Sequence, residues 1–423
     1  MFPDQPPKLL AAAPEEARWD AVRGLFINDP DETYLNTGSW GVMPRSVYEV
    51  MTASVREREL NPTRSRTRLL EGVREARHRL ASFIHVSPSD LALLMNVTVA
   101  INVVVNGLLW QPGDEILASD QEYGAIDNCL HNASRRWGIA LRRAKIPIPP
   151  TCPECVSQAF EAGITDRTRL VLCSHITTGT GLIAPVKALA DLAHAHGALI
   201  VVDGAHAPGM IPLDLEAYGC DFYGGNCHKW LCAPQGVGFL HAAPHVQERM
   251  RHLVAGWGYS QDGTTADDTG RPLIKGEPYM WGIEQWGTFS MPEQIAMGEA
   301  VRLQEEIGPD RIAERGRQLA GHLRQRMAEH NWATLISPSH PEMTGSISTF
   351  VLDGFGSMRL GEILFDRYKI TVPVGPQGSA LRIRVSTHIY NTFAHADRLV
   401  EALAELHEEA VSSRRTDGAG NAC

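Results

Sequence analysis

The sequence has little of what marks a secreted, membrane-bound or nucleic-acid-binding protein. Only 8 of its 423 residues are cysteine, too few for a disulfide scaffold, and its net charge of -10 does not favour binding to nucleic acid. No uncharged apolar run approaches the roughly 20 residues that a membrane span needs. Residues 1–7 lack the basic and apolar regions of a signal peptide. We therefore expect a cytoplasmic protein with neither a membrane nor a nucleic-acid partner.

One pair of cysteines, Cys152 and Cys155, has the spacing of half a zinc site. Structural zinc takes four ligands, and no second pair follows at a matching spacing. The sequence therefore predicts no metal site.

Two short apolar segments are followed by charged side chains that suit one kind of chemistry. The first segment, 199–202, ends on Asp203, and the second, 220–223, is followed by His228 and Lys229. A lysine amine can form a Schiff base with an aldehyde cofactor, and a carboxylate can hold a pyridine nitrogen protonated. Taken alone, Asp203 could be a capping residue and Lys229 a surface lysine. Together, in this order, they favour pyridoxal 5'-phosphate (PLP) as the cofactor.

Strand-like and helix-like segments alternate over most of the chain. Residues 91–94, 170–174 and 199–202 have the pattern of buried strands, whereas 99–107 and 185–196 have that of helices. This alternation predicts an α/β fold with a mostly parallel sheet and helical crossovers. In such sheets ligands bind at the carboxyl ends of the strands. That edge would bring together Thr98, Tyr123, Thr178, Asp203 and the 226–229 loop.

Several features have both a functional and a plain interpretation. Thr98 could bind an anion at the start of its helix, or simply cap the helix. Tyr123 could stack on a planar ligand, or be a tyrosine at the rim. The arginine-rich segment 64–79 is read as a helix with a solvated charged face, although one arginine could reach an anionic substrate. The glycine-flanked segment 36–41 is either a plain loop or one that faces the substrate.

The C-terminal third has a different pattern, with helices at 293–306 and 310–329 and strands at 346–352 and 381–386. It predicts a second, smaller α+β domain. Arg384 alternates with apolar residues, so it would bind a substrate carboxylate or form a structural ion pair. The predicted organisation is an N-terminal arm (1–30), a large cofactor-binding domain (31–290), a small domain (291–411) and a flexible tail (412–423).

Five short motifs occur in order along the chain. They are YLNTGS at 34–39, NVT at 96–98, DGAH at 203–206, GNCHKW at 225–230 and RVS at 384–386. As an ordered set, covering roughly 30–410, they resemble the class V aminotransferase family of fold type I PLP enzymes. The similarity is greatest to its isopenicillin N epimerase-like and cysteine desulfurase-like branch. The resemblance implies a large domain with a mostly parallel seven-stranded sheet and a smaller C-terminal α+β domain.

The resemblance also implies a role for individual residues. Lys229 would be the catalytic Schiff-base lysine and proton shuttle, Asp203 would pair with the ring nitrogen, and His206 would pack beside the ring. Tyr123 would stack on the ring, at a position where desulfurases carry histidine. The remaining assignments are Thr98, the Val99 amide and His228 for the phosphate, Thr178 for the phenolic oxygen, and Asn36, Gly38, Ser39 and Arg384 for the substrate, with Arg384 on its α-carboxylate.

A homodimer follows from the same resemblance. Thr288 is similar to the residue that reaches the phosphate bound by the other subunit. The partners implied are therefore a second copy of the chain and a small amino-acid substrate.

The reaction is less constrained than the cofactor. Desulfurases carry a nucleophilic cysteine ahead of the carboxylate-binding arginine, and the segment 372–379 contains none, so persulfide chemistry is not expected. Our first hypothesis is β-elimination (C–S lysis) of a cysteine S-conjugate in specialised metabolism. Epimerisation, transamination and decarboxylation, with or without oxidation by O2, stay open. A PLP-fold binding protein without turnover is the alternative of another class, and the presence of Asp203, His228 and Lys229 weighs against it.

Overall fold

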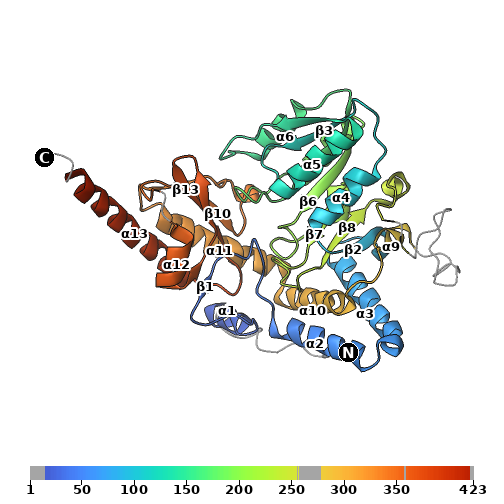
Figure 1. Cartoon of the computed structure of the whole chain (residues 1–423), viewed down its shortest axis with the longest axis horizontal. Helices are drawn as coiled ribbons and strands as arrows, with labels where there is room; N and C mark the ends of the chain where they lie inside the picture. The colour runs from blue at the N-terminus through green and yellow to red at the C-terminus, as the bar shows by residue number, and fades with distance from the viewer. Residues whose placement is uncertain (1–14, 255, 257–277, 357–358, 420–423) are drawn as a thin grey trace.

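The computed structural model describes residues 15–254, 256, 278–356 and 359–419 (Figure 1). A seven-stranded sheet forms its centre. The strands are β2 (Leu91–Leu94), β3 (Glu115–Ser119), β4 (Ala140–Ala144), β5 (Thr168–Ser174), β6 (Leu199–Gly204), β7 (Phe222–Asn226) and β8 (Gly238–Ala242). Their order is β2-β8-β7-β6-β5-β3-β4, and β8 alone runs in the direction opposite to that of the other strands of this sheet. The predicted mostly parallel sheet is confirmed.

Helices bury both faces of this sheet. Successive residues of a strand point to opposite faces, so Val201 packs into one hydrophobic cluster while Ile200 and Val202 pack into another. The helices that follow the strands are α4 (Val97–Gly107), α5 (Gly124–Trp137), α6 (Pro153–Glu161), α7 (Val186–Ala195) and α8 (Leu215–Tyr218). Helix α4 forms despite its β-branched residues because most of them are buried.

Further helices surround the central sheet. They are α1 (Glu15–Arg23), α2 (Arg45–Leu60), α3 (Pro62–Phe83), α9 (Tyr279–Ile283) and α10 (Met291–Ile307). Helix α3 contains the arginine-rich segment, but the expectation of a solvated face is wrong for Arg77, which is only 3% exposed. Its Nη1 donates to the Leu91 carbonyl at 2.7 Å and to the Glu284 carboxylate at 2.8 Å. Arg77 can be buried because the neighbouring carboxylate compensates its positive charge.

The C-terminal region forms a second, antiparallel sheet of order β12-β13-β10-β9. Its strands are β9 (Ala333–Leu335), β10 (Ile347–Leu352), β12 (Val374–Gln377) and β13 (Ala380–Ser386), and its helices are α11 (Pro309–Met327), α12 (Leu360–Tyr368) and α13 (Phe393–Ala419). Helix α13 continues into the segment expected to be a tail. The sequence of this helix contains no proline, and its first glycine is Gly418, so no helix-breaking residue ends it earlier. None of the helices in the described ranges is both long and apolar enough to cross a membrane.

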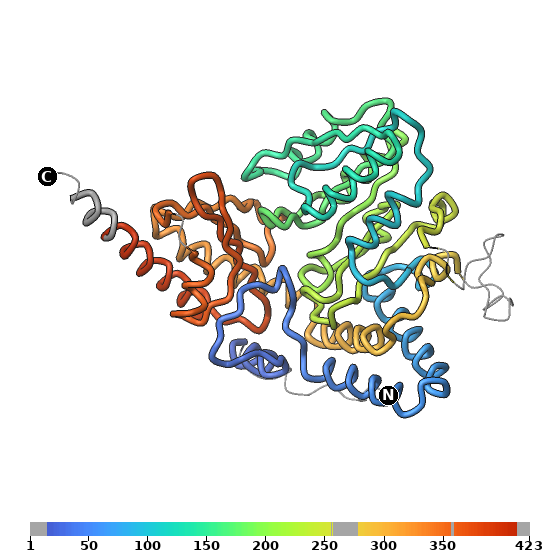
Figure 2. The backbone as a smooth tube through the Cα atoms, viewed as in Figure 1, coloured from blue at the N-terminus to red at the C-terminus, as the bar shows by residue number. Residues whose placement is uncertain are grey.

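The N-terminal segment joins the two sheets. Strand β1 (Thr33–Tyr34) pairs in parallel with β11 (Ile370–Thr371) of the C-terminal region. The chain then rises between the two sheets, as Figure 2 shows in blue, before it enters α2. The Gly41 amide donates to the His228 carbonyl at 2.9 Å. The segment 36–41 is therefore held by both regions.

Candidate active site

Lys229 lies in the turn after β7, with Nζ 3.3 Å from Nε2 of His206. Burial lowers the pKa of Lys229 to about 8, although the nearby Asp203 carboxylate opposes this shift, and the charge of Arg384 adds to it. A larger fraction of this amine is therefore neutral near pH 7 than of an ordinary lysine. A neutral amine is what a nucleophile or a general base requires.

Asp203 lies near the end of β6, beside Gly224 of β7, and is 2% exposed. Its Oδ1 accepts a hydrogen bond from the Ala205 amide at 2.8 Å. Burial raises the pKa of this carboxyl, while the Ala205 amide and the charge of Lys229 lower it. A buried carboxylate is costly unless a cation pairs with it. The site therefore suits a protonated ring nitrogen.

His206 connects three of the residues at this edge. Its Nδ1 accepts from Trp230 Nε1 at 3.2 Å, and its Nε2 lies 2.9 Å from Thr178 Oγ1. Burial, followed by the charge of Lys229, lowers the pKa of His206 well below its usual value, so the ring is neutral. Because Nδ1 accepts, the proton of the neutral ring is on Nε2. That N–H points to Thr178 and to Lys229.

The residues assigned to the phosphate lie around the start of α4 and the end of β7. Thr98 is in the first turn of α4. The Val99 amide donates to Asn96 Oδ1 at 3.0 Å, so it can hold a phosphate only in competition with this cap. His228 Nδ1 is buried and has no hydrogen-bond partner among the described residues. Burial lowers the pKa of His228 to about 4, so its neutral ring can donate one hydrogen bond.

The predicted substrate loop meets Arg384. Arg384 Nη2 donates to Asn36 Oδ1 at 3.1 Å and to Ser39 Oγ at 3.0 Å. A Cβ on Gly38 would lie 2.8 Å from Ser386 Oγ and 3.3 Å from Cζ of the arginine, so a larger residue there would force one of these side chains or the loop to move. Asn36, Gly38, Ser39 and Arg384 therefore lie together in one cluster.

These residues fit PLP. In the described part of the chain, His228 Nδ1, Arg384 Nε and Ser386 Oγ are buried without a partner. Buried polar atoms are normally hydrogen-bonded, so unpartnered atoms around one site indicate a missing ligand. Together with the buried carboxylate of Asp203 and the partly neutral amine of Lys229, they provide donors, an acid partner and a nucleophile for such a ligand.

Two predicted residues are less directly connected. Tyr123 immediately precedes α5 and is 49% exposed, and no described hydrogen bond joins its side chain to the other predicted site residues. Thr288 lies in the exposed segment between α9 and α10. No described contact joins Thr288 to the other predicted site residues of the same chain, so its reach into a second subunit stays a prediction.

Glu122 is not among the residues predicted from the sequence, although it lies beside this site. Its Oε1 accepts from Ser119 Oγ at 2.5 Å, and its Oε2 accepts from Ser174 Oγ at 2.6 Å. Ser174 is paired with Asp203 across β5 and β6. Burial raises the pKa of Glu122 to about 7, the two serines oppose this, and the charge of Asp203 adds to it. A glutamate after a strand is usually a surface residue. The one sequence signal for a role at the site is its position next to Tyr123.

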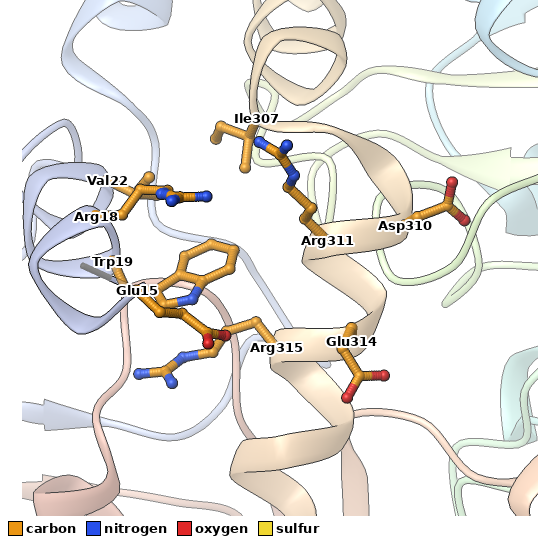
Figure 3. Close-up of a pocket in the computed structure, with 9 residues that line it drawn as sticks. All are labelled: Glu15, Arg18, Trp19, Val22, Ile307, Asp310, Arg311, Glu314 and Arg315. Carbon is orange, nitrogen blue, oxygen red and sulfur yellow. The ribbon is translucent and has the colours of Figure 1, made fainter. Parts of the chain in front are cut away.

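A separate hollow of about 350 Å3 lies between α1 and α11 (Figure 3). Arg315 there donates to both carboxylate oxygens of Glu16, at 2.7 and 3.0 Å, and its guanidinium lies over the Trp19 ring. None of the predicted site residues lines this hollow. It is therefore distinct from the Lys229 site.

Comparison with known proteins decides the family. The family model "Aminotransferase class-V" matches residues 34–399. The chain belongs to the class V aminotransferase family. This class V enzyme is 37% identical over 395 residues to isopenicillin N epimerase of Streptomyces clavuligerus, covering 93% of this chain and 99% of the relative. It is 27% identical to a probable cysteine desulfurase of Methanothermobacter thermautotrophicus, covering 89% and 95%.

Solved structures agree on the fold. A variant of C-DES with glycine covalently linked to its PLP cofactor has a TM-score of 0.81 at 22% identity, covering 90% of this chain and 98% of its own. The cysteine desulfurase of Thermococcus onnurineus NA1 has a TM-score of 0.82 at 20% identity, covering 92% and 98%. The class V aminotransferase is thus a PLP-dependent enzyme with the predicted fold, and its family, fold and cofactor are confirmed.

Proposed function

We propose that this enzyme cleaves the C–S bond of a cysteine S-conjugate by β-elimination. The observation that supports this most directly is the single amine base at the site, Lys229, next to a neutral His206. The segment 372–379 brings no cysteine nucleophile. Such a site suits a reaction that needs one base and a leaving group.

Each site residue has its own role in the proposed reaction. PLP, when bound, would supply an aldehyde for the substrate amine and an electron sink for the charge at the α-carbon. Arg384, held by Asn36 and Ser39, binds the α-carboxylate and fixes the orientation of the substrate. Lys229 Nζ takes the α-proton. His206 Nε2 holds that amine in place.

The electron pair of the broken C–S bond leaves with sulfur. The thiolate takes a proton and departs as a thiol, and the three-carbon remainder is hydrolysed to pyruvate and ammonia. Neither step needs an acid on the face opposite Lys229.

Epimerisation is the second candidate, because the relatives at 37% and 38% identity over more than nine tenths of the chain are named isopenicillin N epimerases. This reaction returns a proton to the opposite face of the α-carbon. The Tyr123 hydroxyl is the group that the proposed stacking position would bring to that face.

The test uses the purified holoenzyme and a panel of cysteine S-conjugates in D2O. Formation of thiol and pyruvate in equal amounts, lost in Lys229→Ala, supports β-elimination. Intact conjugate that exchanges its α-hydrogen and inverts its configuration supports epimerisation instead. Release of CO2, or conversion of the cofactor to its amine form without thiol, would contradict both. A cofactor whose absorbance responds to none of the conjugates would favour a binding protein.

We also propose a homodimer in which Thr288 reaches the phosphate of the other subunit's cofactor. Its exposure, without a described contact to its own site, supports this. In Thr288→Ala, the dimer should persist in analytical ultracentrifugation while PLP dissociates several-fold faster. An unchanged dissociation rate would contradict the proposal.

A further inference from the structure

A second arginine lies on the same face of β13 as Arg384. Alternate strand residues point to opposite faces, and Leu381, Ile383 and Val385 fill the C-terminal hydrophobic core. Arg382 and Arg384 therefore point away from that core, toward the active site. Two positions along a strand separate their Cα atoms by ~7 Å. Burial and then the charge of Arg382 lower the pKa of Arg384, which agrees with this proximity.

Arg382 faces open space and has no partner in the described part of the chain. Its side chain is exposed and makes no hydrogen bond or ion pair among the described residues. Gly375, directly opposite on β12, would have nothing within 4 Å of an added Cβ. By contrast, Arg367 on α12 pairs with Glu405 at 2.8 Å and with Glu409 at 2.7 Å. The unpaired guanidinium thus borders an open region beside the carboxylate-binding arginine.

Two like charges on one face repel each other. Arg384 gains a counter-ion when the substrate α-carboxylate binds, but a substrate with a single negative charge leaves Arg382 uncompensated. A second anionic group on the side-chain end of the substrate would pair with it. Such a pair adds selectivity as well as affinity, because a neutral analogue leaves the guanidinium unpaired.

We infer that Arg382 is a specificity residue that binds a second carboxylate, carried on the part of the substrate beyond the sulfur atom. This rests on the proposed function, in which Arg384 binds the α-carboxylate. The substrate class is then narrowed to cysteine S-conjugates whose S-substituent ends in a carboxylate.

The test compares two ligands of the same shape. S-(3-carboxypropyl)-L-cysteine carries the second carboxylate, and S-(3-carbamoylpropyl)-L-cysteine replaces it with a neutral amide. The native holoenzyme should have a KM about threefold to tenfold lower for the carboxylate. In Arg382→Gln this preference should disappear through a higher KM for the carboxylate, with kcat and the amide kinetics unchanged. Arg382→Lys should restore part of the preference.

The control is Arg367→Gln, which removes one positive charge from the same region but not from the face of Arg384. It should keep the full preference. Loss of the preference in both variants would show a general effect of charge and overturn the assignment. Equal KM values for the two ligands on the native enzyme would also overturn it, as would a change of oligomeric state in Arg382→Gln alone.

A second measurement separates this inference from the proposed reaction. The change in cofactor absorbance on binding gives a Kd for each ligand and needs no C–S cleavage. A carboxylate preference in Kd, lost in Arg382→Gln, supports the role of Arg382 even if no thiol is released. Thiol release without a preference would support the proposed reaction and refute the role of Arg382.

Discussion

Glu122 and Ser174 are joined by two hydrogen bonds. The Ser174 hydroxyl donates to Oε2 at 2.6 Å, and its amide donates to Oε1 at 3.2 Å. Burial raises the pKa of this carboxyl from 4.5 to about 7. The folded state therefore holds a proton between these pH values that the unfolded state releases, and its free energy of unfolding falls as the pH rises through this window.

Glu122→Gln should remove this pH dependence, because an amide has the same shape but does not titrate. The native enzyme should lose on the order of 3 kcal/mol between pH 4.5 and 7 relative to the variant. Urea unfolding of both holoenzymes at several pH values measures the difference. Parallel curves for the two proteins would refute the buried, proton-binding state of Glu122.

Gly38→Ala should weaken substrate binding. The added Cβ would meet Ser386 Oγ at 2.8 Å and Arg384 Cζ at 3.3 Å, so the guanidinium or the loop must shift. We expect KM to rise about tenfold, since misplaced charged hydrogen bonds lose 1–2 kcal/mol. Gly321→Ala, in α11 with nothing within 4 Å of its added Cβ, is the control and should leave KM unchanged. The same KM for both variants would contradict the close packing at Gly38.

Lys229 should capture PLP faster as the pH rises. Its pKa of about 8, lowered by burial, means that the neutral, nucleophilic amine increases about tenfold per pH unit below that value and levels off above it. Stopped-flow absorbance of the apoenzyme mixed with PLP measures this rate. In Lys229→Ala, borohydride reduction should leave the protein mass unchanged. A rate that keeps rising beyond pH 10 would indicate an ordinary lysine.

Arg77→Met should strongly destabilise the protein, because it leaves the buried Glu284 carboxylate without its cation. The expected loss is about 3–5 kcal/mol in urea unfolding. Lys187→Met breaks the exposed pair with Asp191, which is 2.6 Å long, and should cost less than about 1 kcal/mol. Equal losses would mean that burial of the Arg77 pair has no energetic consequence.

The fold and the central residues could be predicted because their signals are local. Asp203 and Lys229 each follow a short apolar strand, and parallel strands bring such positions to one edge. The contacts of Glu122 could not be predicted, since its serine partners lie on two different strands. The burial of Arg77 could not be predicted for a related reason, because its partner Glu284 belongs to a distant segment of the chain. The competition of Asn96 for the Val99 amide depends on a rotamer that no sequence pattern specifies.

Strand β1 pairs with β11, and the Gly41 amide bonds to His228. The short loop with Asn36 and Ser39 is also bridged to Ser386 at the end of β13, so it is anchored to the C-terminal region at one end and to the Lys229 turn at the other. Arg384 lies on β13 of the C-terminal sheet, whereas Lys229 follows β7 of the central sheet. A bound amino acid, held by Arg384 at one end and beside Lys229 at the other, thus contacts both regions at once. The affinity for the substrate therefore depends on how the two regions are placed relative to each other.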